Sequence, residues 1–178
     1  MEQHDNKPDQ RPETTAEKER FSSGGRTWML VLHGKWGLAI DNVLVWLSGY
    51  SLMTAQYAWA NQTTYTDTLM IRTIGAKSKQ LRTACLPYFQ VGGDLVVRGS
   101  NGGGPTDPHW VHNIRANEHA WIRVNRKNRP VSAHVASGEE RDALYAELCR
   151  MSSSTEGYQL MCAPRELPLV VLRDWNNT

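Results

Sequence analysis

The chain has 178 residues, a formal net charge of +2 and 40% hydrophobic residues. This length is enough for one domain with a substantial hydrophobic core. A net charge this small produces no global field that attracts nucleic acid, so we expect no nucleic-acid partner. The three cysteines have no CxxC spacing, and the six histidines are scattered along the sequence. We therefore expect a cytoplasmic protein with no protein-bound metal.

Residues 1–25 are polar, charged and proline-bearing. Such a segment cannot bury enough apolar area to offset its ordering entropy. We therefore expect a disordered tail, followed by a single domain at 26–178. The tail lacks the apolar stretch of a signal peptide.

Residues 28–60 are mostly apolar, and from 38 to 60 the only charge is Asp41. Apolar residues recur here at helical spacing, at Ile40, Val43, Leu44, Leu47 and Tyr50. We expect an amphipathic helix that packs over the core or over a ligand pocket. The polar residues that dilute this stretch argue against a membrane span, whereas contact with a membrane surface remains open.

Short apolar runs separated by turn residues fill the remainder of the chain. We expect strands at 67–75, 81–90, 95–99, 119–125, 130–136 and 167–172. Two hairpins would be closed by Gly92-Gly93 and by the polar turn at 126–128. Further helices are expected near 108–115 and from Gly138 onward. Five or six short strands with two or three helices indicate an α+β barrel.

Residues 99–108 join one expected strand to a short expected helix and contain four glycines. Glycine lets a backbone approach a ligand closely, because no Cβ stands in the way. Asp107 suits the N-cap of the helix and Pro108 suits its first position. The loop amides and the helix N-terminus would together favour an anion. The alternative is a glycine-rich connection with no ligand, since one glycine cluster is a weak motif.

The turn at 75–82 carries three cations within six residues, Lys77, Lys79 and Arg82. Together with the Ser78 hydroxyl they can hold a phosphate or several carboxylates through charge-assisted hydrogen bonds. The alternative is a solvated hairpin tip. Two anion-suited loops in one small barrel favour a bound polyanion more than either loop does alone. The sequence contains neither a P-loop nor a Rossmann fingerprint.

Three stretches of the sequence carry a family resemblance. Residues 73–83 (TIGAKSKQLRT) are similar to a TTGRKSGxxR turn, and residues 100–117 (SNGGGPTDPHWVHNIRAN) are similar to SKGGxxxNPxWyhNLrANP. Residues 136–141 with 167–172 are similar to a GEER…IPVVVL ending. The sequence thereby resembles the deazaflavin-dependent nitroreductase family of actinobacteria, split β-barrel proteins that use the reduced deazaflavin F420.

The resemblance implies an F420H2-dependent reductase that transfers a hydride to an electron-poor C=C, quinone, imine or nitro group. Its small-molecule substrate would be specialised and apolar, as in secondary-metabolite biosynthesis. The basic turn would hold the phosphate and carboxylates of the cofactor, and the glycine loop would contact its ring. Ser100 and Tyr158 would be the catalytic residues that supply a hydrogen bond or proton. The residues expected to bind the cofactor are Lys77, Ser78, Lys79, Arg82, Ser100, Asn101, Gly102, Gly103, Trp110 and Asn113.

The sequence departs from the family pattern at positions that would face the cofactor. Ala76 stands in place of Arg, Lys79 in place of Gly, and Asn101 in place of Lys. One or two cations that would face the cofactor are therefore missing, with Lys79 as a substitute. FMN is the less favoured alternative to F420, because the basic turn would accept either phosphate.

Two further hypotheses are open, the first of which follows from these departures. One is a barrel without a cofactor that acts as a cyclase or isomerase in a biosynthetic pathway. Its acid–base residues would be drawn from three histidines, His109, His112 and His134. The other is a non-catalytic binder of a cofactor, a haem-like molecule or a lipophilic molecule, with the tryptophan-rich apolar stretch at 28–60 as the binding element. The sequence leaves open a monomer or a homodimer.

Overall fold

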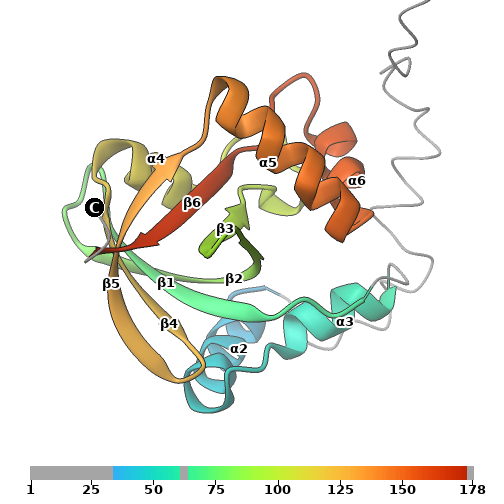
Figure 1. The fold of residues 1–178 in the computed structure, drawn as a ribbon. Helices are drawn as coiled ribbons and strands as arrows, with labels where there is room; N and C mark the ends of the chain where they lie inside the picture. Colours follow the sequence, from blue (N-terminus) through green and yellow to red (C-terminus); the bar gives the residue numbers. More distant parts are fainter. Residues whose placement is uncertain (1–33, 61–63, 176–178) are drawn as a thin grey trace, which may run out of the picture.

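The computed structural model describes residues 34–60 and 64–175. Six antiparallel strands in this part of the chain close into a barrel in the order β1-β2-β3-β6-β5-β4 (Figure 1). The strands are β1 Thr68–Ile74, β2 Leu81–Val91, β3 Asp94–Arg98, β4 His119–Val124, β5 Lys127–Val135 and β6 Leu169–Asp174. The predicted α+β barrel is confirmed. The expected tail at 1–25 lies outside the described residues.

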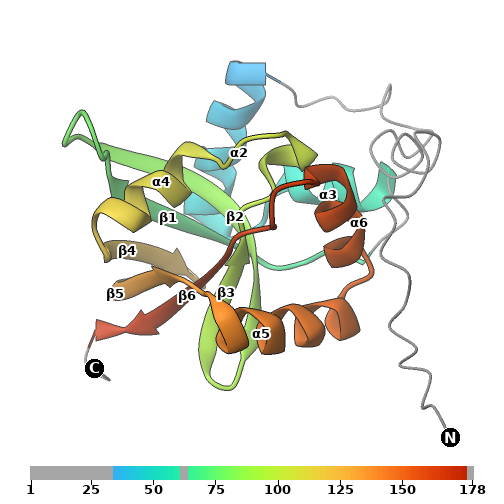
Figure 2. The ribbon, with the colours of Figure 1, turned by 90° about the horizontal axis from the view of Figure 1, so that it is seen from above.

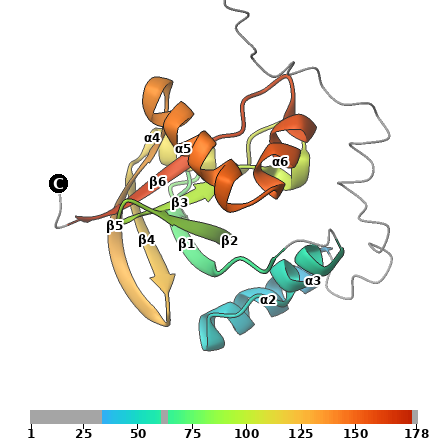
Figure 3. The same ribbon diagram turned by 45° about the vertical axis from the view of Figure 1, so that its right-hand side comes forward.

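Helices surround the barrel on several sides. They are α2 Gly34–Ser48, α3 Leu52–Ala60, α4 His109–Ala116, α5 Gly138–Met151 and α6 Ser154–Cys162, with a short 3-10 helix, η2, at Asn101–Gly103. Helices α2 and α3 lie together on one side of the barrel, while α5 and α6 lie on another (Figures 1 and 3). Helix α6 was not predicted, because its serine-rich start carries no apolar periodicity.

The barrel interior is filled by alternating strand residues, as the pleat requires. Leu69 and Ile71 of β1 are fully buried, and Ile71 pairs with Ile122 of β4. Helix α4 adds Trp110 and Ile114 to the same core cluster. The helix that follows the glycine loop is therefore anchored directly on the barrel core.

The two-residue turns of the β2–β3 and β4–β5 hairpins have the positive φ angles that such hairpins need. Gly92 and Gly93 have φ of +61° and +100°, which confirms the hairpin predicted between β2 and β3. The β4–β5 turn lies at Asn125 and Arg126, with φ of +48° and +63°. Strand β5 therefore begins at Lys127 rather than at residue 130, and the polar turn predicted at 126–128 is shifted.

The expected single helix over 28–60 is two helices, α2 and α3, separated by a 110° bend. The predicted packing face of α2 was also wrong. Asp41 and Val45 are buried at 3% and 2% exposure, whereas Ile40, Val43 and Leu47 are at least half exposed. Apolar residues occur on every side of this helix, so periodicity alone did not reveal which side meets the barrel. The outcome is an apolar surface on α2 that faces away from the core.

Of the described helices, none alone is long and apolar enough to cross a membrane. Residues Trp36–Ser48 and Leu52–Trp59 reach that length and composition only as a bent pair.

Candidate functional site

The glycine loop leaves β3 and passes through η2 before it reaches α4. Asn101, Gly102 and Gly103 have positive φ values of +50°, +63° and +83°. A Cβ on Gly103 would lie 2.8 Å from the Cβ of Met161 in α6, closer than real side chains approach. A Cβ on Gly102 would meet nothing within 4 Å. Gly103 is therefore required for packing on α6, while Gly102 leaves open space on the other side of the loop.

Arg165, in the connection from α6 to β6, holds this loop from behind. Its Nε and Nη2 both donate to the Gly104 carbonyl, at 3.1 and 3.0 Å. Nη2 also donates to the Ser100 carbonyl at 2.9 Å, and Nη1 to the Gly99 carbonyl at 3.3 Å. Nη1 additionally pairs with Asp107 Oδ1 at 3.0 Å. One guanidinium thus determines the path of the loop, and the sequence patterns did not identify it.

Asp107 does not cap α4 as predicted. The N-cap is Pro108, and it has no side-chain capping bond. The Asp107 carboxylate instead accepts hydrogen bonds from Arg165 and Arg115. Two guanidinium partners compete successfully for a carboxylate that would otherwise accept a backbone N–H. Asp107 therefore stabilises the glycine loop through Arg165 rather than capping α4.

The basic turn between β1 and β2 is tied to α4 by Asn113. This side chain is 7% exposed. Its Oδ1 accepts from the Ala76 backbone N–H at 2.9 Å, and its Nδ2 donates to Thr73 Oγ1 at 2.9 Å. Helix α4 lies between the basic turn and the glycine loop (Figure 2). The two anion-suited segments predicted from sequence are therefore both connected to α4, one through Asn113 and the other through the chain itself.

The cations of the basic turn face solvent. Lys77, Ser78, Lys79 and Arg82 are all exposed. Arg82 Nη2 donates to Gln80 Oε1 at 3.2 Å and lies 3.5 Å from Ser78 Oγ. Among the described residues, no carboxylate pairs with any of these three cations. Three positive charges therefore remain available to an anionic ligand.

A cavity of about 280 Å³ lies between α3, α6 and the glycine loop. Ser100, Gly102 and Tyr158, which were predicted from sequence, line it. The other lining residues mix apolar side chains such as Met53 and Pro87 with polar ones. Its volume is close to the lower end of the range of about 300–1,000 Å³ for small-molecule sites. The predicted catalytic pair is therefore brought together at one cavity.

Tyr158 projects from α6 beside a charged neighbour from β3. The Arg98 guanidinium carbon lies 5.2 Å from the Tyr158 ring centroid. Burial raises the pKa of Tyr158 above its usual value, and the charge of Arg98 opposes that shift. The phenol is therefore protonated at neutral pH, which makes it a hydrogen-bond donor.

Asp41 lines the same cavity from α2 and explains the bend between α2 and α3. Its Oδ2 accepts from Ser51 Oγ at 2.7 Å, and its Oδ1 accepts from the Met53 N–H at 3.0 Å. Ser51 Oγ in turn accepts from the Thr54 N–H at 2.9 Å. A carboxylate at the start of α3 satisfies its free amides and suits its dipole. The single charge in the apolar stretch therefore links the two helices.

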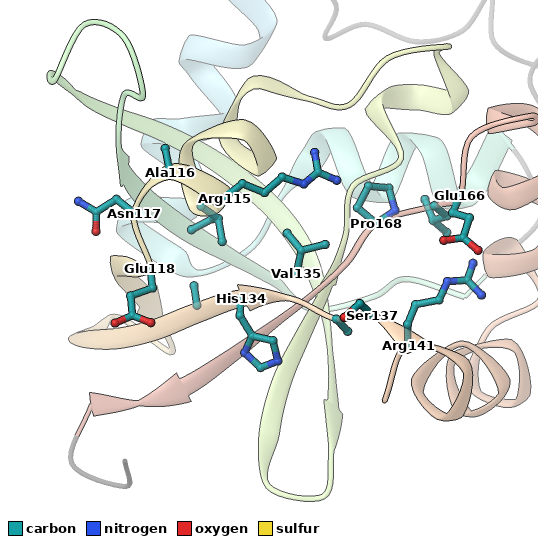
Figure 4. Close-up of a pocket in the computed structure, with 14 residues that line it drawn as sticks. Arg115, Ala116, Asn117, Glu118, His134, Val135, Ser137, Arg141, Glu166 and Pro168 are labelled. Carbon is teal, nitrogen blue, oxygen red and sulfur yellow. The ribbon is translucent and has the colours of Figure 1, made fainter. Parts of the chain in front are cut away.

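A second, larger cavity of about 700 Å³ lies beside α4, β5 and the start of α5. Figure 4 shows its side chains spread around an open depression, with Arg141 and Glu166 at one end and Glu118 at the other. None of the residues predicted to bind the cofactor lines it. His134, which does line it, pairs with Glu140 at 2.9 Å. The smaller cavity is therefore the candidate functional site.

The proposed acid–base histidines do not meet at the smaller cavity. Of the described residues that line it, none is a histidine. His109 and His112 lie on α4 and His134 lies on β5. This arrangement offers no support for histidine acid–base chemistry in that cavity.

Comparison with known proteins identifies the family of this chain. The model of the family described as F420H(2)-dependent quinone reductase matches residues 52–174, which is more than half of the chain. The chain belongs to that family. It is thus an F420H2-dependent oxidoreductase with F420 as its cofactor, as the sequence motifs predicted.

An F420H(2)-dependent quinone reductase of Mycobacterium tuberculosis is 34% identical over 109 residues, covering 58% of this chain and 71% of that protein. A solved F420-H2 dependent reductase is 26% identical, with a TM-score of 0.53 over 60% of this chain and 93% of its own. A solved chain described as a domain-swapped dimer matches with the same TM-score and identity, over 60% of this chain and 79% of its own. These structures support the split-barrel fold.

The residues present fit the family's cofactor. The donor set combines three exposed cations, with which no carboxylate within 34–60 and 64–175 pairs, and a hydroxyl on the basic turn with the backbone of a glycine loop. Asn101 does not replace the charge of the missing lysine, because its amide is neutral, and its Nδ2 donates to the Thr106 carbonyl at 3.0 Å. Lys79 has a positive φ of +56° and is exposed on the same turn as Lys77. Trp110 is 8% exposed and belongs to the barrel core, so it anchors α4 on the barrel.

Proposed function

We propose that this protein uses F420H2 to reduce an electron-poor, mainly apolar small molecule held in the cavity beside the glycine loop. Acceptors of this kind are quinones, activated C=C bonds, imines and nitro compounds. The observation that carries the proposal is the Asn113 link, which joins the basic turn to the helix that follows the glycine loop. A polyanion on that turn would extend along α4 toward the cavity.

The proposed cofactor contacts divide between the two segments. Lys77, Ser78, Lys79 and Arg82 would hold the phosphate and carboxylates of the cofactor through charge-assisted hydrogen bonds. The backbone around Ser100–Gly103 would contact the ring, since Gly102 leaves open space there. Trp110 and Asn113 would shape the site from behind rather than through contact with the ring, because both are buried.

When bound, the reduced cofactor supplies a hydride. The chain's own contribution is to position the acceptor and to stabilise the negative charge that develops on its oxygen. Tyr158 and Ser100 both line the cavity. The protonated phenol of Tyr158 would donate a hydrogen bond to that oxygen, and the Ser100 hydroxyl is the second donor. The apolar lining would exclude water from the acceptor.

A fluorescence titration with oxidised F420 tests the cofactor site. The double variant Lys77→Ala/Arg82→Ala should weaken F420 binding by about 3 kcal/mol or more, if each charged hydrogen bond contributes about 1.5–3 kcal/mol. The matched control is Arg126→Ala/Lys127→Ala, which removes two exposed cations from the β4–β5 hairpin. Unchanged F420 affinity in the first variant would refute the proposed site. Turnover without added F420H2 would instead support the cofactor-free hypothesis.

We also propose that the α2–α3 surface contacts a membrane or a lipophilic substrate reservoir. Trp36 is 85% exposed, and Val43 and Leu47 are each 56% exposed on the outer side of α2. An exposed apolar helix surface of this kind favours an interface between water and acyl chains. This surface adjoins the cavity through Leu38, so an apolar acceptor could pass between them. A cytoplasmic location and a homodimer stay predictions.

A further inference from the structure

Arg98 ends β3 and lines the candidate substrate cavity. Its Nη1 donates to Ser154 Oγ at 3.0 Å and to Thr155 Oγ1 at 2.8 Å, both at the start of α6. Its guanidinium carbon lies 4.7 Å from the Phe89 ring centroid. Two hydroxyl groups and the aromatic rings therefore hold this side chain in one orientation at the cavity wall.

The charge of Arg98 has no carboxylate partner among the described residues. Other partly buried arginines do have one: Arg165 pairs with Asp107 at 3.0 Å, and Arg129 pairs with Asp174 at 2.7 Å. Burial lowers the pKa of Arg98 to about 10, so the side chain is still charged at neutral pH. An unpaired, partly buried cation is costly for a fold, and such charges occur where a ligand or a partner compensates them.

The donors of Arg98 are only partly used. A guanidinium has five N–H groups, and both hydroxyl partners are bound by Nη1. The structure gives Nε and Nη2 no acceptor within residues 34–60 and 64–175. These two nitrogens present parallel N–H groups on one edge of the fork. That edge matches the two oxygens of a carboxylate in bidentate geometry.

The remaining wall of the cavity does not neutralise this charge. Its carboxylate, Asp41, is bonded through one oxygen to Ser51 and through the other to the Met53 N–H. Met53, Ala58 and Pro87 supply apolar surface. The cavity therefore combines apolar surface with the guanidinium of Arg98. The Asp41 carboxylate in its wall is already hydrogen-bonded by the protein.

We infer that the substrate is anionic: a carboxylate on an otherwise apolar electron acceptor binds the Nε/Nη2 edge of Arg98 in bidentate fashion. This inference rests on the proposed function, because it names the substrate class of the same cavity. Arg98 is a specificity-determining residue in this scheme. The repulsion between Asp41 and a misplaced anion gives the substrate one preferred orientation.

Equilibrium dialysis of the full chain, without F420, tests the inference directly. The probes are a naphthoquinone with a short carboxylate side chain and its methyl ester, which differ in charge but share the same ring. We expect the acid to bind about tenfold more tightly or better, as a charge-assisted bidentate pair would give. Equal binding of acid and ester by the unaltered protein would overturn the inference, whatever happens to the variants.

Two variants separate this site from the cofactor site. Arg98→Met should lower the acid-to-ester preference to about one while F420 binding persists. Arg82→Ala should weaken F420 binding while the acid-to-ester preference persists. Arg98→Lys should restore part of the preference, because it keeps the charge without the fork. A preference that survives in a folded Arg98→Met variant would refute the role of Arg98. Unchanged F420 binding in the Arg82→Ala variant would count only against the proposed cofactor site.

Discussion

Arg165 pairs with Asp107 at 3.0 Å while it also donates to the carbonyls of Gly99, Ser100 and Gly104. The connection between α6 and β6 thus holds a loop that lies about sixty positions earlier in the chain. Both charged side chains are well covered, at 15% and 14% exposure. The backbone that is proposed to contact the deazaflavin ring therefore depends on a residue that need not touch the cofactor.

Replacing Arg165 with Met tests this dependence. The change would remove the Arg165 hydrogen bonds to three loop carbonyls and the ion pair with Asp107, so we expect the free energy of unfolding to fall by about 3–5 kcal/mol. F420 affinity should fall as well, because the loop would lose its path. Urea unfolding and F420 titration measure the two effects. Arg150→Met is the control, since Arg150 is exposed and pairs with Glu147 on the same helix; equal behaviour of the two variants would contradict the prediction.

Asn113→Ala should uncouple the basic turn from α4. It removes a buried acceptor for the Ala76 N–H and a donor to Thr73, at a cost of about 1–3 kcal/mol in stability. We expect faster amide hydrogen exchange at Ala76 and weaker F420 binding, although Lys77 and Arg82 are untouched. Asn128→Ala, at an exposed position on β5, serves as the control. Normal exchange at Ala76 in the Asn113 variant would show that the link does not hold the turn.

Gly103→Ala and Gly102→Ala form a matched pair in one loop. Both positions have positive φ, which costs an alanine about 1–2 kcal/mol. Only the Gly103 change also drives a Cβ into Met161, which should add about 1–3 kcal/mol for overpacking. The midpoint of urea unfolding should therefore fall further for Gly103→Ala. Equal midpoints would mean that α6 moves away without cost.

Stability at alkaline pH should depend on Cys85. Its thiol donates to Asn42 Oδ1 at 3.0 Å, and burial, with a smaller contribution from Asp41, raises its pKa from 9.0 to about 12. In the unfolded chain the thiol loses its proton near pH 9, whereas the folded chain keeps it until about pH 12. The folded state is therefore favoured fully below pH 9 and loses that advantage as the pH rises from 9 to 12.

Urea unfolding of the unaltered protein and of Cys85→Ala between pH 8 and 11 isolates this effect. Arg98 titrates in the same range with the opposite sign, because its pKa is lowered to about 10. The difference between the two proteins cancels that contribution. We expect the difference in the free energy of unfolding to be independent of pH near pH 8. Above pH 9 the unaltered protein should lose stability relative to the variant. A difference that stays flat to pH 11 would show that the thiol is not protected by burial.

The outward surface of α2 should bind lipid. Trp36→Ser/Val43→Ser should reduce cosedimentation with phosphatidylcholine vesicles by about tenfold or more, because both changes remove exposed apolar area. Trp121→Ser/Met151→Ser is the control, since these exposed apolar residues lie on β4 and α5. Vesicles that also contain phosphatidylglycerol distinguish apolar from electrostatic binding. Equal loss in both variants would indicate general stickiness rather than a membrane surface on α2.

The local sequence determined most of the barrel. Short apolar runs bounded by turn residues placed all six strands, and the pair Gly92-Gly93 marked a hairpin because it needs positive φ at both positions. The two anion-suited segments were recognisable for a similar reason, since clustered cations and glycines are contiguous in the chain. The family motifs could be recognised for the same reason, because each is a run of consecutive residues. These features depend on neighbours in sequence, so sequence alone reveals them.

Only the tertiary structure decided which of these pieces meet. Asp107 was expected at a helix cap, but Arg165, far along the chain, takes its carboxylate instead. Apolar side chains surround α2, so the barrel contact rather than the periodicity selected Asp41 and Val45 for burial. Arg98 ends an apolar strand without any local signal of its role. Its proposed role depends on α6 and on the cavity, because the groups that folding places around a charge decide what that charge can bind.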